Sequence, residues 1–396
     1  NMQNPPKGTQ TFKCNGAEST FRFRDFFCAA PGTKFAALDL SQIEVRTLAW
    51  LSRDKDMLDR IAESPDIYQA FAEAFGLWDP EQGLMKEVSP DLRNFTKPVV
   101  LGSGFGASAW AFAEKEAEQL RKAVDRKYAG STTKQQEKDA LEWLKSQTTE
   151  VGTWWWKKAG RMLCRKATMS VDLTSPSGSS YTARREQWKE FSKYVEDLDD
   201  KLDRHAEVPI EIETWDWDIQ SVLVMKEATY CVDLYRGSMP HVTRFWKRLT
   251  RILKGSLLDR YMEFVLPSGN KMVYRNVKQV QPTKKEGEES EGAQIFCTIV
   301  RNGQKKPMKP WYGLLTENLA QSLARDVFGF ILRALEEAGF EILFHVHDEV
   351  AVLLPKDKAE ELIKVAEGLM SEPPEWIPDL PIAAEGNFGE TYADCK

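Results

Sequence analysis

The chain of 396 residues is long enough for two or three domains and a sizeable core, and its 42% apolar and 29% charged residues are ordinary for a folded protein. No stretch approaches the roughly 20 continuous apolar residues that span a bilayer, and the polar N-terminus has no signal or transit sequence. Six scattered cysteines without a CxxC argue against a zinc ribbon or a disulfide framework and favour a reducing compartment. The formal charge of −6 argues against a surface that coats nucleic acid throughout, but it leaves room for a local basic groove.

Taken in chain order, the apolar patterns predict an α+β fold. KFAALDL at 34–40 predicts a short buried strand, and a helix is expected from about 42 to 51. KKEGEESEG at 284–292 predicts a solvated loop between two strands. Leucine and other apolar residues recur every four positions from Leu315 to Leu335, which predicts a helix of about 25 residues ended by Gly339. Residues 339–354 then predict two strands around a polar tip. A sheet with helices packed on one face is the expected result.

Acids at the ends of these strands need an explanation, because burying a carboxylate without a partner is unfavourable. Asp39 ends the first strand, and Asp348 and Glu349 occupy the polar tip 309 positions later (348 minus 39). Magnesium is a hard cation that needs only one or two protein carboxylates besides water and substrate phosphates. The alternatives are a magnesium site and ordinary turn acids that accept backbone hydrogen bonds.

Three motifs around these acids resemble those of the family A DNA polymerases, in the family's order. LDLSQIEVR at 38–46 is similar to the first polymerase motif, RNFTKPVVLGSGFG at 93–106 to the fingers-helix motif, and VHDE at 346–349 to the third motif. The segments NMQNPP at 1–6 and GNFGETYADC near the C-terminus also resemble family segments. The residues of three stretches, VLGSGFG, LPSGNKMVY and WYGLLTENLAQSLARD, are most similar to those of phage-encoded members.

The resemblance implies a DNA-directed DNA polymerase that uses two Mg²⁺ ions, for which Mn²⁺ could substitute. Asp39, Asp348 and the backbone carbonyl of Leu40 would hold the metals, with Glu349 in support of the catalytic site. Lys97 would protonate the pyrophosphate leaving group. The dNTP would contact Leu40, Gln42, Glu44, Arg93, Lys97, Leu101 and Phe105.

Within this set, Glu44 matches the glutamate that excludes a ribose 2′-hydroxyl, so dNTPs are the expected substrates. Pro98 disfavours helical angles at Lys97, so the fingers helix is expected to begin near Pro98 or to kink there. The resemblance also implies a set of DNA contacts, at Gln3, Asn4, Arg46, Gly106, Asn318, Gln321 and His347.

The resemblance implies a polymerase palm, an antiparallel sheet with packed helices, and mostly helical fingers. The expected boundaries are palm at 1–60, fingers at 61–310 with an insertion at about 118–219, and palm again at 311–396. The thumb and the proofreading exonuclease are expected to be absent, and Asn1 in place of Met indicates a fragment or a processed chain. A separate chain or a missing N-terminal region would supply them, and the −6 charge predicts weak DNA binding by this chain alone.

The insertion holds seven of the thirteen tryptophans. WWWKKAGRMLCRK at 154–166 could stack single-stranded bases and follow phosphates, it could form the insertion's own core, or it could bind a partner protein.

Two alternatives to a DNA polymerase stay open from sequence. One is a single-subunit RNA polymerase relative, which the SQIE context of Glu44 disfavours, and the other is a catalytically idle DNA-binding or scaffold subunit. The expected partners are primer–template DNA and dNTPs, and no membrane is expected. The expected location is the cytoplasm, which is that of the bacterial host if a phage encodes the chain. The expected process is phage DNA replication.

Overall fold

The computed structural model describes residues 9–14, 17–64, 66–147, 153–163, 191, 193–195, 212, 215–281, 293–301 and 303–395. The chain divides into two compact units. Unit 1 holds residues 1–93, 104–106 and 238–396, and unit 2 holds residues 94–103 and 107–237. The predicted loop at 284–292 and most of 164–211 lie outside the described residues. Within the described residues, no helix is long and apolar enough to cross a membrane.

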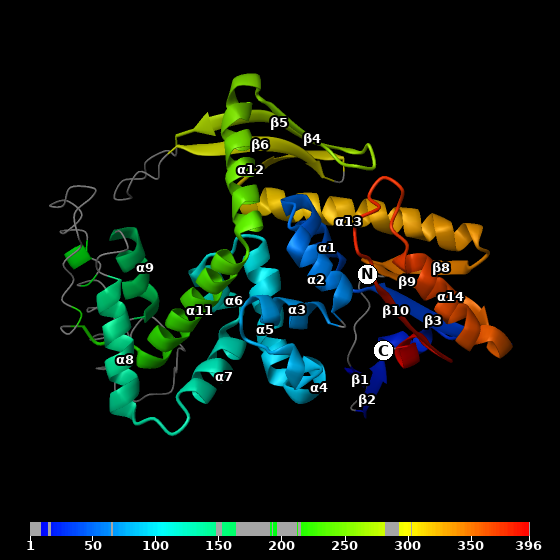
Figure 1. Ribbon diagram of the computed structural model, residues 1–396, viewed down its shortest axis with the longest axis horizontal. Helices are drawn as coiled ribbons and strands as arrows, with labels where there is room; N and C mark the ends of the chain where they lie inside the picture. The colour runs from blue at the N-terminus through cyan, green and yellow to red at the C-terminus, as the bar shows by residue number, and fades with distance from the viewer. Residues whose placement is uncertain are drawn as a thin grey trace. The chain divides into compact units, whose positions relative to one another are not determined.

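The central sheet of unit 1 has the strand order β10-β3-β9-β8, and each strand pairs antiparallel with its neighbour. It is built from β3 (Thr33–Leu40), β8 (Glu341–Val346), β9 (Glu349–Pro355) and β10 (Ala384–Gly389). Figure 1 shows strands from the two ends of the chain side by side in this sheet. The predicted first strand and the hairpin around the polar tip are confirmed.

Alternate side chains of β3 enter two different cores, as the two-residue period of a strand requires. Ala36, Leu38 and Leu40 pack with β9 against α13 (Tyr312–Glu337) and α14 (Ala359–Ser371). Phe35 and Ala37 face the opposite core, which is closed by η5 (Tyr392–Cys395). Because Asp39 follows in this second series, the pleat directs it to the face that carries η5.

The long helix α13 confirms the predicted apolar stripe: its residues at 315, 319, 323, 327, 331 and 335 are all buried. It ends one residue before Ala338, and Gly339 takes the left-handed φ of +87° that commonly follows a helix. Alongside it, α1 (Ile43–Ser52) confirms the helix predicted after the first strand. The buried Thr47 hydroxyl donates to the carbonyl of Ala320 at 3.1 Å and ties α1 to α13.

A second antiparallel sheet of unit 1 has the order β4-β5-β6-β7, and α12 (Pro240–Asp259) packs against it. Its strands are β4 (Tyr261–Val265), β5 (Lys271–Val280), β6 (Gln294–Arg301) and β7 (Gln304–Met308). The remaining elements of unit 1 are β1 (Thr9–Cys14), β2 (Ala17–Arg22), η1 (Phe23–Phe26), α2 (Lys55–Glu63), α3 (Ile67–Ala74), η2 (Pro80–Gln82), α4 (Met85–Val88) and η4 (Lys356–Lys358). The helices and antiparallel sheets together confirm the α+β class.

Unit 2 is helical over its described residues, with α6 (Ala109–Lys115), α7 (Ala117–Lys127), α8 (Thr133–Ser146), α9 (Thr153–Leu163) and α11 (Ile219–Ser238), whose last residue counts with unit 1. Tryptophans of the insertion fill its interior. Trp156 is fully buried, and the rings of Trp155 and Trp156 lie 4.8 Å apart with Trp110 and Trp217 next to them. For the described tryptophans, the structure supports the core interpretation over a base-stacking patch.

Candidate active site

Two acids meet across the central sheet of unit 1. Asp39 of β3 is directly opposite Glu349 of β9 in the antiparallel register. Directly opposite residues of such a pair hold their Cβ atoms about 4.5–5.5 Å apart, and like charges there destabilise a sheet. Pairing of β3 with β9 therefore concentrates negative charge at one point, which calls for hydrogen bonds or a cation to offset it.

Asp348 joins this pair from the turn between β8 and β9. The backbone N–H of Leu40 donates to the carbonyl of Asp348 at 3.1 Å, so this turn is fixed against the end of β3. The side chains of Asp39 and Asp348 share a hydrogen bond. Burial raises the pKa of Asp348, the nearby Glu44 raises it further, and hydrogen bonds to its own backbone and to Asp39 partly offset this. Residues 309 positions apart thus form one acidic centre, and the binding of a metal by it stays a prediction.

The second acid of the turn, Glu349, is 4% exposed and accepts a hydrogen bond from the hydroxyl of Tyr392 in η5. Tyr392 is fully buried, and burial together with this bond to Glu349 raises its pKa. Glu349 was predicted from the sequence, whereas Tyr392 was not. Its signal was present in the C-terminal segment that resembles the family, but no local pattern links it to a residue 43 positions earlier.

Glu44 lies in the first turn of α1, after Gln42, whose left-handed φ of 46° turns the chain from strand to helix. Burial raises the pKa of Glu44, a hydrogen bond with Gln321 of α13 lowers it, and the nearby Glu317 raises it. His347 contributes attraction to both Glu44 and Asp348. Pairwise interactions therefore connect five predicted residues: Asp39, Glu44, Gln321, His347 and Asp348.

Arg46 lies 6% exposed at the base of this arrangement. Its Nε donates to the carbonyl of Ser41 at 2.7 Å, and its Nη1 donates to that of Pro381 at 3.1 Å. Burial lowers the pKa of Arg46 to about 10. These bonds hold the β3–α1 connection, which carries Gln42 and Glu44, against the segment before β10. The contact of Arg46 with DNA stays a prediction.

The predicted fingers helix is α5, which runs from Pro90 to Gly104 with Pro98 inside it. The expectation that it begins near Pro98 is wrong, and Arg93 and Lys97 lie one turn apart on one helix. Arg93 forms an ion pair with Asp66, the cap of α3, and its guanidinium lies 5.1 Å from the Tyr68 ring centroid.

The remaining predicted residues have these positions. Lys97 and Leu101 belong to unit 2, and Phe105 belongs to unit 1 just after α5. Gly106 has a φ of +78°, and a Cβ there would lie 2.6 Å from the Tyr312 ring, so only glycine fits.

The predicted DNA contacts on α13 differ in their surroundings. Gln321 is exposed, whereas the partly buried Asn318 donates from its amide to the hydroxyl of Tyr274 at 3.0 Å. His347 is exposed at the hairpin tip with a left-handed φ of 56°. Gln3 and Asn4 lie outside the described residues.

The fit of a divalent cation rests on Asp39 and Asp348. Within the described ranges, no group of three or more His, Cys, Asp and Glu side chains is arranged to ligate one ion. Two hydrogen-bonded carboxyls beside Glu349 and Glu44 nevertheless suit Mg²⁺, because this ion takes hard oxygen ligands and completes its shell with water and substrate phosphates. A cation would also offset the repulsion between these acids.

Comparisons with known proteins agree with the motifs. Residues 1–141 match the family described as DNA polymerase family A. A DNA polymerase of Bacillus phage SP02 is 34% identical over 127 residues, which cover 32% of this chain and 19% of that protein. DNA polymerase I of Pseudomonas aeruginosa is 34% identical over 112 residues, 27% of this chain and 12% of that protein. The matched segments thus span a fifth or less of these two relatives' length.

A solved structure was also found, the POL domain of Pol1 from M. smegmatis in complex with DNA primer-template and dNTP. The alignment covers 94% of this chain and 42% of that structure's chain, at 16% identity and a TM-score of 0.47.

Proposed function

We propose that the chain is a template-directed DNA polymerase of family A, the family that its residues 1–141 match. It would add dNTPs to a primer 3′-hydroxyl on a primer–template. The observation that carries this proposal is the joining of Asp39 and Asp348 by the β3–β9 pairing, beside Glu44 of the same motif. The similarity to a Bacillus phage polymerase supports a role in phage DNA replication.

Asp39 and Asp348 would hold divalent cations, which we infer to be two Mg²⁺ ions, with the backbone carbonyl of Leu40 facing the same place. When bound, these ions supply electrostatic stabilisation for the charge that develops on the α-phosphate and for the attacking 3′-hydroxyl. We infer that Glu349 supports the site, because its carboxylate lies opposite Asp39 and is held by the Tyr392 hydroxyl.

We assign substrate selection to Glu44. Its carboxylate is held by Gln321 and partly buried, so its position is fixed rather than free to move away from a sugar. A side chain fixed there would exclude a ribose 2′-hydroxyl. The exposed Gln321 on the same helix would read the minor groove of the primer–template, and His347 would contact the primer-terminal phosphate.

On α5, Arg93 and Lys97 would bind the triphosphate, Arg93 as a fork and Lys97 as a point charge that also protonates the leaving group. On substrate binding, Arg93 would break its ion pair with Asp66 and form one with the triphosphate. Leu101 and Phe105 would lie against the incoming nucleotide and the templating base. We propose the palm as residues 1–60 and 311–396, and the fingers as 61–310.

The experiment is primer extension with dNTPs by the parent chain and by Asp39→Asn and Asp348→Asn. We expect extension by the parent and its loss in both variants, with far-UV circular dichroism unchanged. Asp357→Asn, at an exposed acid of η4, is the matched control and should extend normally. Full activity in either site variant would overturn the catalytic assignment.

A second measurement separates the alternatives. Glu44→Ala should gain ribonucleotide incorporation, whereas Glu360→Ala on the exposed face of α14 should not. Extension by the parent with rNTPs in preference to dNTPs would instead favour an RNA polymerase. Primer–template binding without any extension, even after supply of a partner chain, would favour the idle scaffold.

A further inference from the structure

One stretch of the chain has a strong net positive charge. Residues 240–309 hold 15 Lys and Arg against 6 Asp and Glu, a net charge of +9, so the rest of the chain carries −15. This stretch comprises α12 and the β4–β7 sheet. A chain that is acidic on average therefore presents a strongly basic region, and a region of this kind attracts polyanions.

The cations of α12 form a stripe. Its members are all exposed: Arg244, Lys247, Arg248, Arg251 and Lys254. Each lies three or four residues from another member, which places them on one face of the helix. From Arg244 to Lys254 the helix rises by about 15 Å, at roughly 1.5 Å per residue. None of these five side chains forms an ion pair with a described residue. The stripe is thus available to an external anion.

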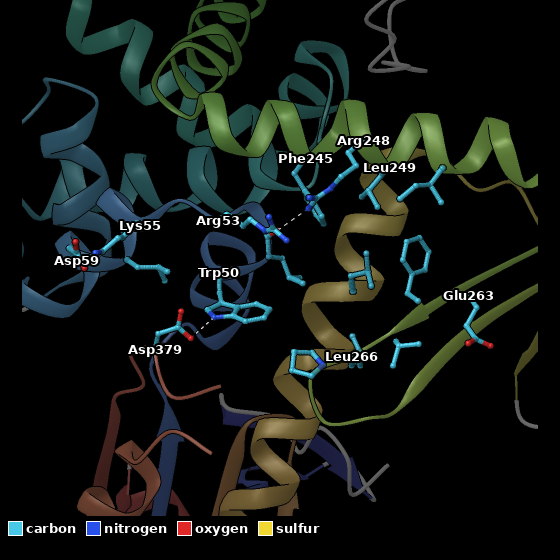
Figure 2. A pocket seen from close by; sticks show the side chains of 17 residues that line it. Trp50, Arg53, Lys55, Asp59, Phe245, Arg248, Leu249, Glu263, Leu266 and Asp379 are labelled. Atoms are coloured by element: carbon cyan, nitrogen blue, oxygen red, sulfur yellow. Dashed lines mark hydrogen bonds between the residues drawn. The ribbon is translucent and has the colours of Figure 1, made fainter. Parts of the chain in front are cut away.

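A pocket of about 890 Å³ lies beside this stripe (Figure 2). Its walls include the aromatic rings of Trp50, Phe245 and Phe264. Arg248 belongs to both features, because it lines the pocket and donates from Nη2 to the carbonyl of Leu51 at 3.4 Å. That bond brings its charge next to the end of α1, where Arg53 lines the same pocket.

The cations and the acids that line the pocket differ in whether they already have partners. Arg53, Lys55 and Arg248 line it, and none of them is ion-paired to a described residue. Of the acids in the lining, Glu263 is paired with Lys271 at 3.0 Å, and Asp379 accepts a hydrogen bond from the Trp50 indole at 2.8 Å. Asp59 is the third acid of the lining. The lining thus holds three cations and three acids, and two of the acids already have partners.

We propose that the α12 stripe and this pocket form a binding surface for single-stranded DNA, separate from the acidic centre. The stripe would follow phosphates, and the pocket would receive an unpaired base against its aromatic walls. A duplex could use the stripe but not the pocket, because its bases are stacked inside. Cations beside the partly exposed rings of Trp50 and Phe264 are typical of single-strand binding. The surface would serve the proposed polymerase by holding unpaired template.

The experiment is fluorescence anisotropy of a labelled single-stranded oligonucleotide with the full chain, without primer or dNTP, at 50 to 200 mM salt. The test variant is Lys247→Ala/Arg251→Ala/Lys254→Ala. The matched control is Arg333→Ala/Lys358→Ala/Lys364→Ala, three exposed cations of α13, η4 and α14. Because the assay requires no catalysis, its failure leaves the proposed activity untouched.

We expect weaker binding by the stripe variant and a smaller dependence on salt. Each lost phosphate contact lowers the slope of log K against log salt by about 0.7, so three contacts lower it by about 2 and reduce the affinity loss between 50 and 200 mM by roughly 20-fold. An unchanged slope, or an equal loss in the control variant, would overturn the proposal.

The pocket has its own readout. An oligonucleotide that contains 5-iododeoxyuridine should crosslink on irradiation to peptides that hold Trp50, Phe245 or Phe264, and a blunt duplex with the same base inside should not. Equal affinity for that duplex, with crosslinks only elsewhere, would show a phosphate surface without base binding and would overturn the single-strand assignment.

Discussion

The hydroxyl of Tyr392 gives the sharpest stability test, because it donates to a carboxylate that water cannot reach. Tyr392 is 0% exposed and Glu349 4% exposed. Hydrogen bonds to charged groups contribute about 1.5–3 kcal/mol, and neutral ones about 0.5–1.5 kcal/mol. Tyr392→Phe should therefore lower the free energy of unfolding by about 1.5–3 kcal/mol, read from the urea midpoint at a constant m-value.

The matched control is Tyr274→Phe. Tyr274 is also buried, but its hydroxyl accepts a hydrogen bond from the neutral amide of Asn318. Its loss should cost only about 0.5–1.5 kcal/mol. In a Glu349→Gln background, Tyr392→Phe should cost about as little, because the carboxylate is gone. The charged hydrogen bond would be refuted if the two Tyr→Phe substitutions lowered the free energy of unfolding equally. It would also be refuted if Tyr392→Phe lowered it as much in the Glu349→Gln background as in the parent.

The same bond predicts a pH dependence. Burial and the bond to Glu349 raise the pKa of Tyr392 above its ordinary value of 10.0. A raised folded-state pKa means that the contribution is fully present below pH 10 and is lost as pH rises toward the folded-state value. The stability difference between the parent and Tyr392→Phe should hence be constant from pH 7 to 9 and shrink above pH 10. A constant difference up to pH 11 would contradict this assignment.

Further variants test packing and reactivity. Gly106→Ala should destabilise unit 1 by more than Gly269→Ala, because both have positive φ but only the first would place a Cβ against the Tyr312 ring; equal urea midpoints would contradict this. Trp156→Ala should lower the free energy of unfolding by about 3–5 kcal/mol and unfold unit 2 before unit 1, which limited proteolysis would detect. An unaltered cleavage pattern would argue against the tryptophan core. Cys28 is exposed, whereas burial raises the pKa of Cys231, so maleimide should modify Cys28 before Cys231, as followed by mass spectrometry.

Much of the fold near the acids was predictable, because its signals are local. A strand that ends in Asp39 and an apolar stripe from Leu315 to Leu335 need only side-chain periodicity to be recognised. The contact of Tyr392 with Glu349 was not predictable in this way, since it depends on how η5 closes over the sheet. The ion pair of Arg93 with Asp66 is likewise a tertiary contact between two helix ends.

Two local rules were also insufficient by themselves. Pro98 disfavours a helix at Lys97, yet α5 continues through it, and tertiary packing outweighed the local preference. The tryptophans near position 155 have the composition of a nucleic-acid patch, and burial alone decides that they form a core. For α12 the reverse holds. Its basic stripe is visible in the sequence, but the pocket beside it is lined by residues of five separate elements, α1, α2, α12, β4 and α13.

The pairing of β3 with β9 has a consequence for how such a chain can change. Because hydrogen bonds between strands hold Asp39 near Asp348, the number of residues between them does not affect their separation. Loops and whole helices can be gained or lost inside that interval while the two carboxylates keep their places. A single residue inserted within β3 itself, by contrast, would turn Asp39 to the opposite side of the sheet. Insertions should therefore be tolerated in the segment between the two acids but not within β3, only a few residues away.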